Sequence, residues 1–214
     1  EQTAIANYLN TKTAAIDRKI ELLTAKADKY KALRRSLINE TVCRGLPASE
    51  GFTQSETLTK MKDSGIEWIG MIPEHWEVKP IKIIASCNDD SLPESFSPDT
   101  PIRYVDISSV SHDAGIAEPE FMLFWDAPSR ARRKARAGDV VVSTVRTYLK
   151  AVAAVDDAHA DCVYSTGFAV LRPRKEHLTP EFLKWLALNE LLIQAVESHS
   201  EGLSYPAINA SELI

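Results

Sequence analysis

The sequence predicts an α+β protein in which a long N-terminal coiled-coil helix precedes a mixed α/β domain. Residues 3–46 have apolar side chains at helical spacing, and no proline or glycine interrupts them before Gly45. Short runs of Val and Ile between residues 102 and 172 are typical of buried or half-buried strands. Thr179 and Pro180 then form a helix start ahead of a leucine-rich segment. This order of elements describes a helical arm attached to an α+β domain.

The first helix is expected to pair with a second helix. Five of its apolar side chains recur every seven residues, the spacing of a coiled-coil seam rather than of a wide globular face. The residues that we predict to pair are Leu9, Ile16, Ile20, Leu23, Tyr30 and Leu37. Basic residues are expected on the opposite face: Lys12, Arg18, Lys19, Lys26, Lys29, Lys31 and Arg35. At 1.5 Å per residue the helix is on the order of 60 Å long. That length suits either a dimerisation helix or a rigid spacer between two recognition modules.

The composition is that of an ordinary globular protein. Charged residues make up 26% of the chain and hydrophobic residues 44%, and no run of about 18 apolar residues occurs. The N-terminus has no signal sequence, and it begins inside a helical pattern, as a cut within a longer protein would. Three cysteines without metal-binding spacing predict reduced thiols, and we therefore expect a cytoplasmic protein.

After the helix, the chain divides into a linker and a domain. Residues 47–66 are polar and rich in Ser and Thr, which is typical of a linker. Residues 67–203 are expected to form the domain, and residues 204–214 to begin a further region that ends in a first helical turn. Trp68 and Trp76 either anchor a loop against the core or form an exposed base-stacking platform.

Hydrophobic patterns predict the elements of the domain. Residues 81–87 are an apolar run that fits either a strand or a helix. A single helix is expected from Pro180 to about Ser198, with Thr179 as its N-cap. Strands are expected at residues 102–107, 140–142, 150–155 and 163–172, and a loop at residues 201–210.

The main functional signal lies in residues 130–150, where two polar clusters flank a buried strand. Residues 131–150 contain six basic residues and one acidic residue, in a chain with a formal net charge of −5. The first cluster is a positive surface suited to phosphates and comprises Arg130, Arg132, Arg133, Lys134 and Arg136. The strand end offers donors for phosphates and base edges and comprises Ser143, Thr144, Arg146, Thr147, Tyr148 and Lys150. Together they favour nucleic-acid binding, and the alternative is a solvated basic loop.

Catalytic motifs are incomplete or missing from the sequence. Glu77, Val78 and Lys79 have the Glu-x-Lys form of a metal-dependent nuclease, but the Pro98-Asp99 pair that should precede them follows them. The sequence has no Gly-rich phosphate loop, nucleophile elbow, zinc-protease motif or S-adenosylmethionine signature. Its five histidines are scattered, and we expect all of them at the surface. The sequence therefore predicts a binding protein without catalytic residues, metal or cofactor of its own.

Four segments resemble motifs of the specificity (S) subunits of type I restriction-modification systems. Residues 1–9, EQTAIANYL, are similar to the end of the family's PPLxEQxxIAxYLD element, without its Pro-Pro-Leu. Residues 29–46 resemble the family's LxxxRxxLIxExVTxGL helix end. Residues 61–78 resemble the lead-in to a target recognition domain, and residues 137–143, AGDVVVS, resemble that domain's GDILxS strand.

The resemblance implies an architecture and a set of partners. Such subunits have two target recognition domains, each reading one half of a split site in double-stranded DNA, and two conserved helices that pair antiparallel as a ruler. They are not enzymes: they dock methyltransferase (M) subunits and act with motor-endonuclease (R) subunits. S-adenosylmethionine, ATP and Mg²⁺ belong to those partners. Here residues 1–46 match one spacer helix and residues 67–203 one recognition domain. The partner helix would come from the second half of the subunit or from another copy, and no membrane partner is implied.

Recognition domains vary within this family, so the residues that read bases are assigned from their chemistry. We expect base contacts from Arg146, Thr147 and Tyr148, and phosphate contacts from the basic cluster and Lys150. The resemblance also places near DNA a set of loop residues, Ser165, Thr166, Gly202, Ser204 and Tyr205. The competing interpretation is a coiled-coil adaptor whose α+β head binds protein, which would show no salt-dependent affinity for DNA.

Overall fold

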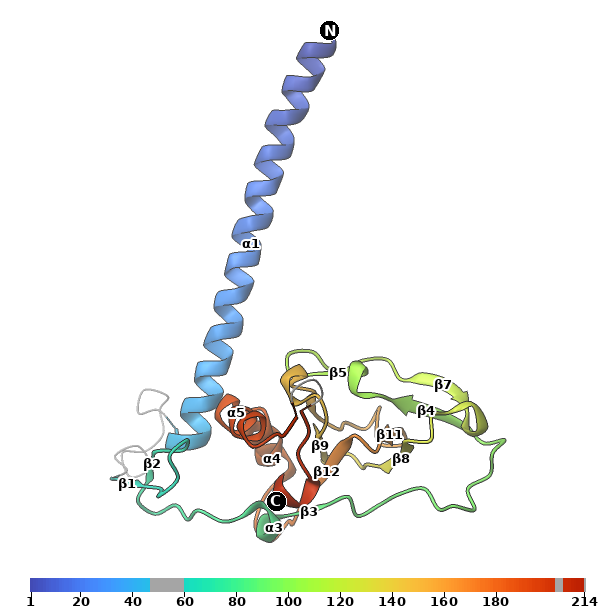
Figure 1. Ribbon diagram of the computed structural model, residues 1–214. Helices are drawn as coiled ribbons and strands as arrows, with labels where there is room; N and C mark the ends of the chain where they lie inside the picture. Colours follow the sequence, from blue (N-terminus) through green and yellow to red (C-terminus); the bar gives the residue numbers. More distant parts are fainter. Residues whose placement is uncertain (47–59, 203–205, 214) are drawn as a thin grey trace.

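The long N-terminal helix projects away from the rest of the molecule (Figure 1). The computed structural model describes residues 1–46, 60–202 and 206–213. Helix α1 (Gln2–Arg44) ends at Gly45, which has a positive φ of 86° and donates its N–H to the carbonyl oxygen of Thr41 over 3.0 Å. A β-rich domain with further helices follows, so the predicted α+β architecture is confirmed.

Only the C-terminal end of α1, from about residue 38, is buried against the domain, and we call this end the foot of α1. Ile38, Val42 and Cys43 are buried there, whereas the six predicted pairing residues are 53–66% exposed. The seam is thus open along its length, and its pairing stays a prediction. The expectation that the basic residues lie opposite the seam is wrong for Lys26, whose Nζ is 5.7 Å from the centre of the Tyr30 ring. Among the described residues, no helix is long and apolar enough to cross a membrane.

A hairpin and a mixed segment lead from α1 into the domain. Strands β1 (Met61–Asp63) and β2 (Met71–Pro73) pair antiparallel, and β2 contacts α1. Trp68 and Trp76 are partly buried and line a groove together with Val42, which favours the anchoring interpretation. Of the expected linker, residues 47–59 lie outside the described residues.

Two four-stranded sheets form the centre of the domain. The first has the strand order β10-β9-β12-β3 and is antiparallel, and the second has the order β7-β4-β11-β8, with β4 and β11 parallel. Their strands are β3 (Ala85–Cys87), β4 (Pro101–Val105), β7 (Glu120–Leu123), β8 (Ala131–Lys134), β9 (Val140–Ser143), β10 (Val152–Ala154), β11 (Val163–Ser165) and β12 (Phe168–Pro173). The described chain also contains a hairpin of β5 (Val110–Ser111) and β6 (Gly115–Ile116), and short 3-10 turns at η1 (Ile107–Ser109), η2 (Phe124–Asp126) and η3 (Thr147–Leu149).

The predicted strands are found with two corrections. Residues 81–87 adopt both alternatives in succession, helix α3 (Ile81–Ile84) and then β3. Residues 163–172 are not one strand, because the chain leaves the second sheet after β11 and enters the first as β12. The crossing occurs at Thr166 and Gly167, where the backbone passes too close to Ile107 for a side chain at Gly167. Strands β7 and β8 were not predicted.

The core has three layers, formed by helices, the first sheet and the second sheet. Val140 and Val142 of β9 pack toward the helices, with Leu183 and Ile193. Val141 packs toward the second sheet, with Tyr164 among others. Both faces of β9 are therefore buried, which explains its uninterrupted run of valines.

The C-terminal helices differ from the single helix that was expected. The N-cap is confirmed, since Thr179 Oγ1 accepts the Phe182 N–H over 3.3 Å at the start of α4 (Pro180–Ala187). The helix is interrupted at Asn189, whose Oδ1 accepts the N–H groups of Leu191 and Leu192 and so caps α5 (Glu190–Ser198). A last short helix, α6 (Ala210–Leu213), begins at the final residue of the predicted loop.

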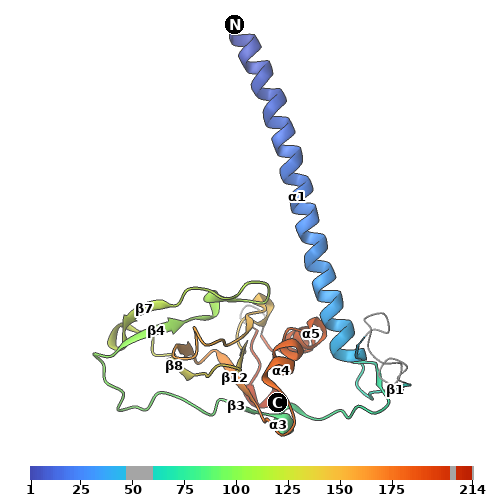
Figure 2. The same cartoon turned by 180° about the vertical axis from the view of Figure 1, so that it is seen from behind.

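Both views of the molecule show the C-terminal end of α1 beside α5 (Figures 1 and 2), and polar contacts hold it there. Asn39 Oδ1 accepts the Glu190 N–H over 2.9 Å, and Asn189 Nδ2 donates to Cys43 Sγ over 3.5 Å. Arg35 and Asp113 form an exposed ion pair of 3.8 Å. The carboxylate of Glu190 also binds Lys150, which directly follows η3. One residue therefore connects α1 to the loop after β9.

Candidate nucleic-acid interface

The first basic cluster lies on and beside β8, an edge strand of the second sheet. Arg130 is exposed, and its guanidinium binds Asp106 at 3.0 Å and the Tyr104 hydroxyl at 3.2 Å. Arg132 lies with its guanidinium 4.9 Å from the centre of the Phe124 ring. These contacts hold both arginines by protein groups while leaving Arg130 open to solvent.

The other basic residues of this cluster differ in exposure and in whether another side chain binds them. Arg133 is partly buried and contacts Ser91 Oγ at 3.4 Å, with its Nε buried and unpaired. Arg136 forms an ion pair with Asp90 at 2.8 Å. Lys134 is exposed at the end of β8. Lys134 therefore fits a phosphate contact best, because carboxylates already pair with Arg130 and Arg136 and Arg133 lies deeper.

The second cluster forms a rigid corner after β9. Arg146 and Lys150, on either side of η3, both have left-handed backbone conformations, with φ of 49° and 50°. Between them, Tyr148 is 54% exposed and Leu149 is 45% exposed, and Arg146 is exposed as well. The Arg146 N–H donates to the Pro206 carbonyl over 2.8 Å, which ties the corner to the C-terminal loop. The exposed side chains therefore stand on a fixed backbone.

Four of the predicted contact residues have their hydroxyls turned into the protein. Ser143, Thr144, Thr147 and Ser165 are all buried. Their hydroxyls bind, in that order, the Val145 carbonyl, the Gly167 carbonyl, Ser200 Oγ and the Gly167 N–H. In this conformation the four hydroxyls stabilise the loops and do not face a ligand. Lys150 likewise forms an ion pair with Glu190. Small hydroxyl residues are suited to both roles, and sequence alone does not separate them.

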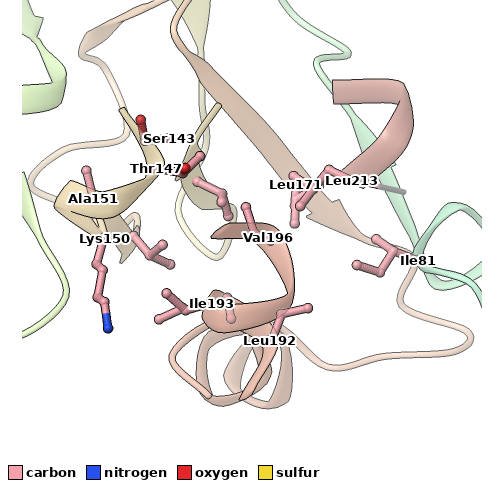
Figure 3. A pocket seen from close by; sticks show the side chains of 13 residues that line it. Ile81, Ser143, Thr147, Lys150, Ala151, Leu171, Leu192, Ile193, Val196 and Leu213 are labelled. Atoms are coloured by element: carbon pink, nitrogen blue, oxygen red, sulfur yellow. The ribbon is translucent and has the colours of Figure 1, made fainter. Parts of the chain in front are cut away.

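The floor beneath the corner is too small to be a ligand site. Figure 3 shows Ser143 and Thr147 beside a cavity whose other walls include Leu171, Ile193 and Val196. Its volume is about 20 Å³, roughly the space of one water molecule. The corner is therefore an outward-facing surface and not the rim of a pocket.

Backbone hydrogen bonds bring the two clusters together. The Thr166 N–H donates to the Arg130 carbonyl over 2.7 Å, and the Thr144 N–H donates to the Gly167 carbonyl over 2.8 Å. The next loop joins on the far side, where the Ile208 N–H donates to the Thr144 carbonyl over 2.9 Å. Gly202 lies in that loop, exposed and with φ of 112°. The exposed residues brought onto this strip of loops are Arg130, Arg146, Tyr148, Thr166 and Gly202, while Ser204 and Tyr205 lie outside the described residues.

A Gly167→Ala variant is expected to lose about 1 kcal/mol of stability, because its new Cβ would lie 2.6 Å from Ile107 Cδ1 and 3.1 Å from Val145 Cγ2. Shortening the first neighbour in a Gly167→Ala, Ile107→Val double variant should recover most of that loss. Urea unfolding followed by circular dichroism would measure both. Equal stability of the single variant and the wild type would contradict the close approach.

The described side chains that could act in catalysis do not come together in a catalytic or metal-binding arrangement. In the described part of the chain, no group of three or more His, Cys, Asp or Glu side chains is placed to hold a metal ion. The hydrogen bond from Lys79, 3.0 Å away, lowers the pKa of Glu77, the candidate nuclease carboxylate. Burial raises the pKa of the Cys162 thiol to about 11, so that it stays protonated at neutral pH. One histidine differs from expectation: His112 is buried, with Nε2 3.0 Å from the Leu188 carbonyl.

Sequence analysis missed the residues that hold this surface in place. Glu190 joins Lys150 to the foot of α1, and Asp106 holds Arg130. The pair Asn189-Glu190 is itself an N-cap followed by an acidic first turn, a signal that could have marked a second helix start. No local sequence pattern indicates that Asp106 holds Arg130, because the two residues are 24 positions apart in the chain.

Comparisons with known proteins agree with the motifs. No protein-family model matches the chain, and no curated protein matches it. Among solved structures, the HsdS subunit of Thermoanaerobacter tengcongensis matches with a TM-score of 0.54 and 32% identity. That match covers 65% of this chain and 38% of the other. A second match is to a chain of a type I R-M system studied for its complex assembly and conformational transition. Its TM-score is 0.51 and its identity 32%, over 64% of this chain and 37% of the other.

The chain thus spans less than two fifths of the length of the solved subunits that it matches. Over the matched part, about a third of the aligned residues are identical. HsdS is the specificity subunit that the four sequence motifs indicated. Over the matched part, the chain is therefore similar to the HsdS specificity subunit of a type I restriction-modification system.

Proposed function

We propose that this chain reads one half of a bipartite DNA site and serves as the recognition part of a type I restriction-modification complex. The observation that carries the proposal is the meeting of two basic clusters on one strip of loops, with Arg146 and Tyr148 exposed on a rigid corner. Its likeness to specificity subunits supports the same role. A fixed backbone that presents an arginine and an aromatic ring suits base recognition, and flanking cations suit phosphates.

The contacts divide between two kinds of side chain. Arg146, with Tyr148 beside it, reads base edges, because the guanidinium can form two hydrogen bonds to guanine. Arg130 and Lys134 contact phosphates, which gives affinity without sequence preference. Thr166 and Gly202, which are exposed on the same strip, are expected to contact the DNA backbone.

The partners follow from the family. Helix α1 acts as the spacer: it pairs through its seam with a second helix and holds two recognition domains a fixed distance apart. Methyltransferase subunits dock on the chain, and motor-endonuclease subunits join the complex. Those partners bind S-adenosylmethionine, ATP and Mg²⁺, and this chain contributes recognition rather than catalysis.

The first test is co-expression of the intact parent gene with its methyltransferase subunit, followed by mapping of modified adenines across the genome. A split motif with two different halves is expected if a second recognition domain is present in the parent. A palindromic split motif is expected if two copies of this half assemble. An assembled complex that methylates no site would contradict the proposal.

A Lys134→Ala variant is expected to weaken binding to all DNA sequences alike and to lower the salt slope of the affinity by about one. Lys134 is exposed at the end of β8, where it can reach a phosphate but is not on the corner that carries Arg146. Fluorescence anisotropy against salt concentration, on matched and mismatched sites, would measure this. A loss of affinity confined to one DNA sequence would mean that Lys134 contacts a base and not a phosphate.

One observation favours a second candidate, the adaptor with a protein-binding head. Phe121 and Trp125, on β7 and η2, are 74% and 64% exposed. Exposed aromatic side chains of this size are enriched at protein interfaces. The same salt titration discriminates the two functions, since an adaptor would show no steep loss of DNA affinity with salt.

A further inference from the structure

Helix α5 holds the corner after β9 through contacts at both of its ends. At the N-terminal end of α5, the Glu190 carboxylate forms an ion pair with the Lys150 ammonium. Just beyond its C-terminal end, Ser200 Oγ accepts a hydrogen bond from Thr147 Oγ1 over 2.9 Å. Only the first contact involves charged groups, and it occupies a cation that belongs to the second basic cluster.

The Glu190 side chain extends from a backbone that α1 and the helix cap hold in place. The Glu190 N–H donates to Asn39 Oδ1 of α1 over 2.9 Å. Asn189, the residue directly before it, caps α5. The Glu190 side chain is 15% exposed, whereas that of Lys150 is 35% exposed. The carboxylate is therefore a counter-ion in a fixed position, to which the longer lysine side chain comes.

Glu190 stays ionised in this position, so its attraction for the lysine persists at neutral pH. Burial by itself would raise the pKa of Glu190, but the hydrogen bond and the charge of Lys150 hold that pKa below its ordinary value. The positive charge of Arg35, on α1, acts in the same direction. A half-buried carboxylate that is ionised and hydrogen-bonded competes well with an outside anion for the same ammonium.

Lys150 lies where a released ammonium would reach bound DNA. It is the second residue after Tyr148, whose ring is exposed on the corner. Figure 3 shows its ammonium pointing away from the cavity beneath the corner. An ammonium on a flexible four-carbon stem reorients readily and binds phosphate as a point charge. Such a contact would add affinity for every DNA sequence alike.

We propose that Glu190 is a positioning residue whose carboxylate holds Lys150 in an ion pair and keeps its ammonium away from the phosphates of bound DNA. Glu190 thereby limits the affinity of the protein for DNA of any sequence. A lower sequence-independent affinity shortens the stay at unmatched sites, which far outnumber matched sites in a genome. The inference deepens the proposed function and rests on it for the binding of DNA.

The test is a Glu190→Gln variant of the 214-residue chain, which keeps the length of the side chain and the N–H that binds Asn39. Fluorescence anisotropy against salt concentration would use a matched half-site and an unrelated duplex of equal length. The released Lys150 should make the salt slope steeper by about 0.9, the value for one phosphate contact. Between 1 M and 0.1 M salt, the affinity should then rise roughly eightfold more than in the wild type. Both duplexes should gain equally, so that the ratio of matched to unmatched affinity stays the same.

Three further variants make the test specific to the ion pair. A Glu190→Gln, Lys150→Met double variant has no ammonium to release and should return to the wild-type slope. Glu190→Asp keeps the carboxylate within reach of the flexible lysine and should also keep that slope. Glu197→Gln removes the same charge from the same helix, and Glu197 forms no ion pair among the residues that the structure describes. Its slope should therefore not change. Circular dichroism would confirm that each variant is folded.

Two results would overturn the inference. An unchanged salt slope in Glu190→Gln would show that Glu190 does not keep Lys150 from phosphates, and an accompanying fall in the ratio of matched to unmatched affinity would mean that Glu190 orients the corner instead. A steeper slope that the double variant retains would assign the new contact to a residue other than Lys150. A wild-type chain without affinity for either duplex would instead contradict the proposed function itself.

Discussion

An Arg146→Ala variant is expected to bind its DNA half-site about 5- to 150-fold more weakly, the 1–3 kcal/mol of one good base contact. Arg146 is exposed on a corner that its own N–H fixes to the Pro206 carbonyl. The backbone of Arg146 is therefore held in place, and its side chain is exposed on that corner. Anisotropy on a panel of sites with single base changes, chosen from the methylation map, should show relaxed preference at one position only.

Two further variants of Arg146 separate charge, geometry and strain. Arg146→Lys keeps the charge and should retain the salt dependence while losing discrimination, because an ammonium cannot form the paired hydrogen bonds of a guanidinium. Arg146→Gly should lose the same discrimination yet stabilise the fold, since glycine tolerates the φ of 49°. Equal weakening of all sites by the Ala and Lys variants would mean that Arg146 contacts a phosphate.

An Arg172→Ala variant is expected to lose about 3 kcal/mol of stability, the cost of leaving a buried carboxylate without its partner. Asp139, in the segment that resembles the family's GDILxS strand, is 2% exposed and receives hydrogen bonds from Arg172 Nε at 3.0 Å and Nη2 at 2.8 Å. The same arginine also binds Asp90 at 3.0 Å. Its removal should lower the unfolding midpoint in urea without changing which DNA is bound.

Matched variants test whether the burial of Asp139 is the reason that Arg172→Ala loses so much stability. Arg136→Ala removes an ion pair with the same Asp90, but Arg136 is exposed, so a change below about 1 kcal/mol is expected. An Asp139→Leu, Arg172→Met double variant removes both charges and should be more stable than Arg172→Ala alone. A loss for Arg136→Ala as large as that for Arg172→Ala would show that burial does not govern these pairs.

The local elements were largely predictable, because each depends on a short stretch of sequence. The run from residue 2 to 44 has helical spacing and a glycine stop, and the valines of β9 form a buried strand as expected. Thr179 caps its helix as predicted. Two boundaries were missed, at Asn189 and at Gly167, since a cap inside a leucine-rich segment and a crossing between sheets do not disturb the hydrophobic pattern.

By itself, the sequence determined most of the elements, the family resemblance and the positions of the two basic clusters. The tertiary structure decided which members of those clusters are exposed. Thr147 and Tyr148 are neighbours in sequence, yet one is buried against Ser200 and the other is more than half exposed. Likewise, Arg130 and Thr144 lie on one strip only because the turn at Thr166 and Gly167 hydrogen-bonds to both. Such contacts join residues far apart in the chain, and composition and spacing carry no record of them.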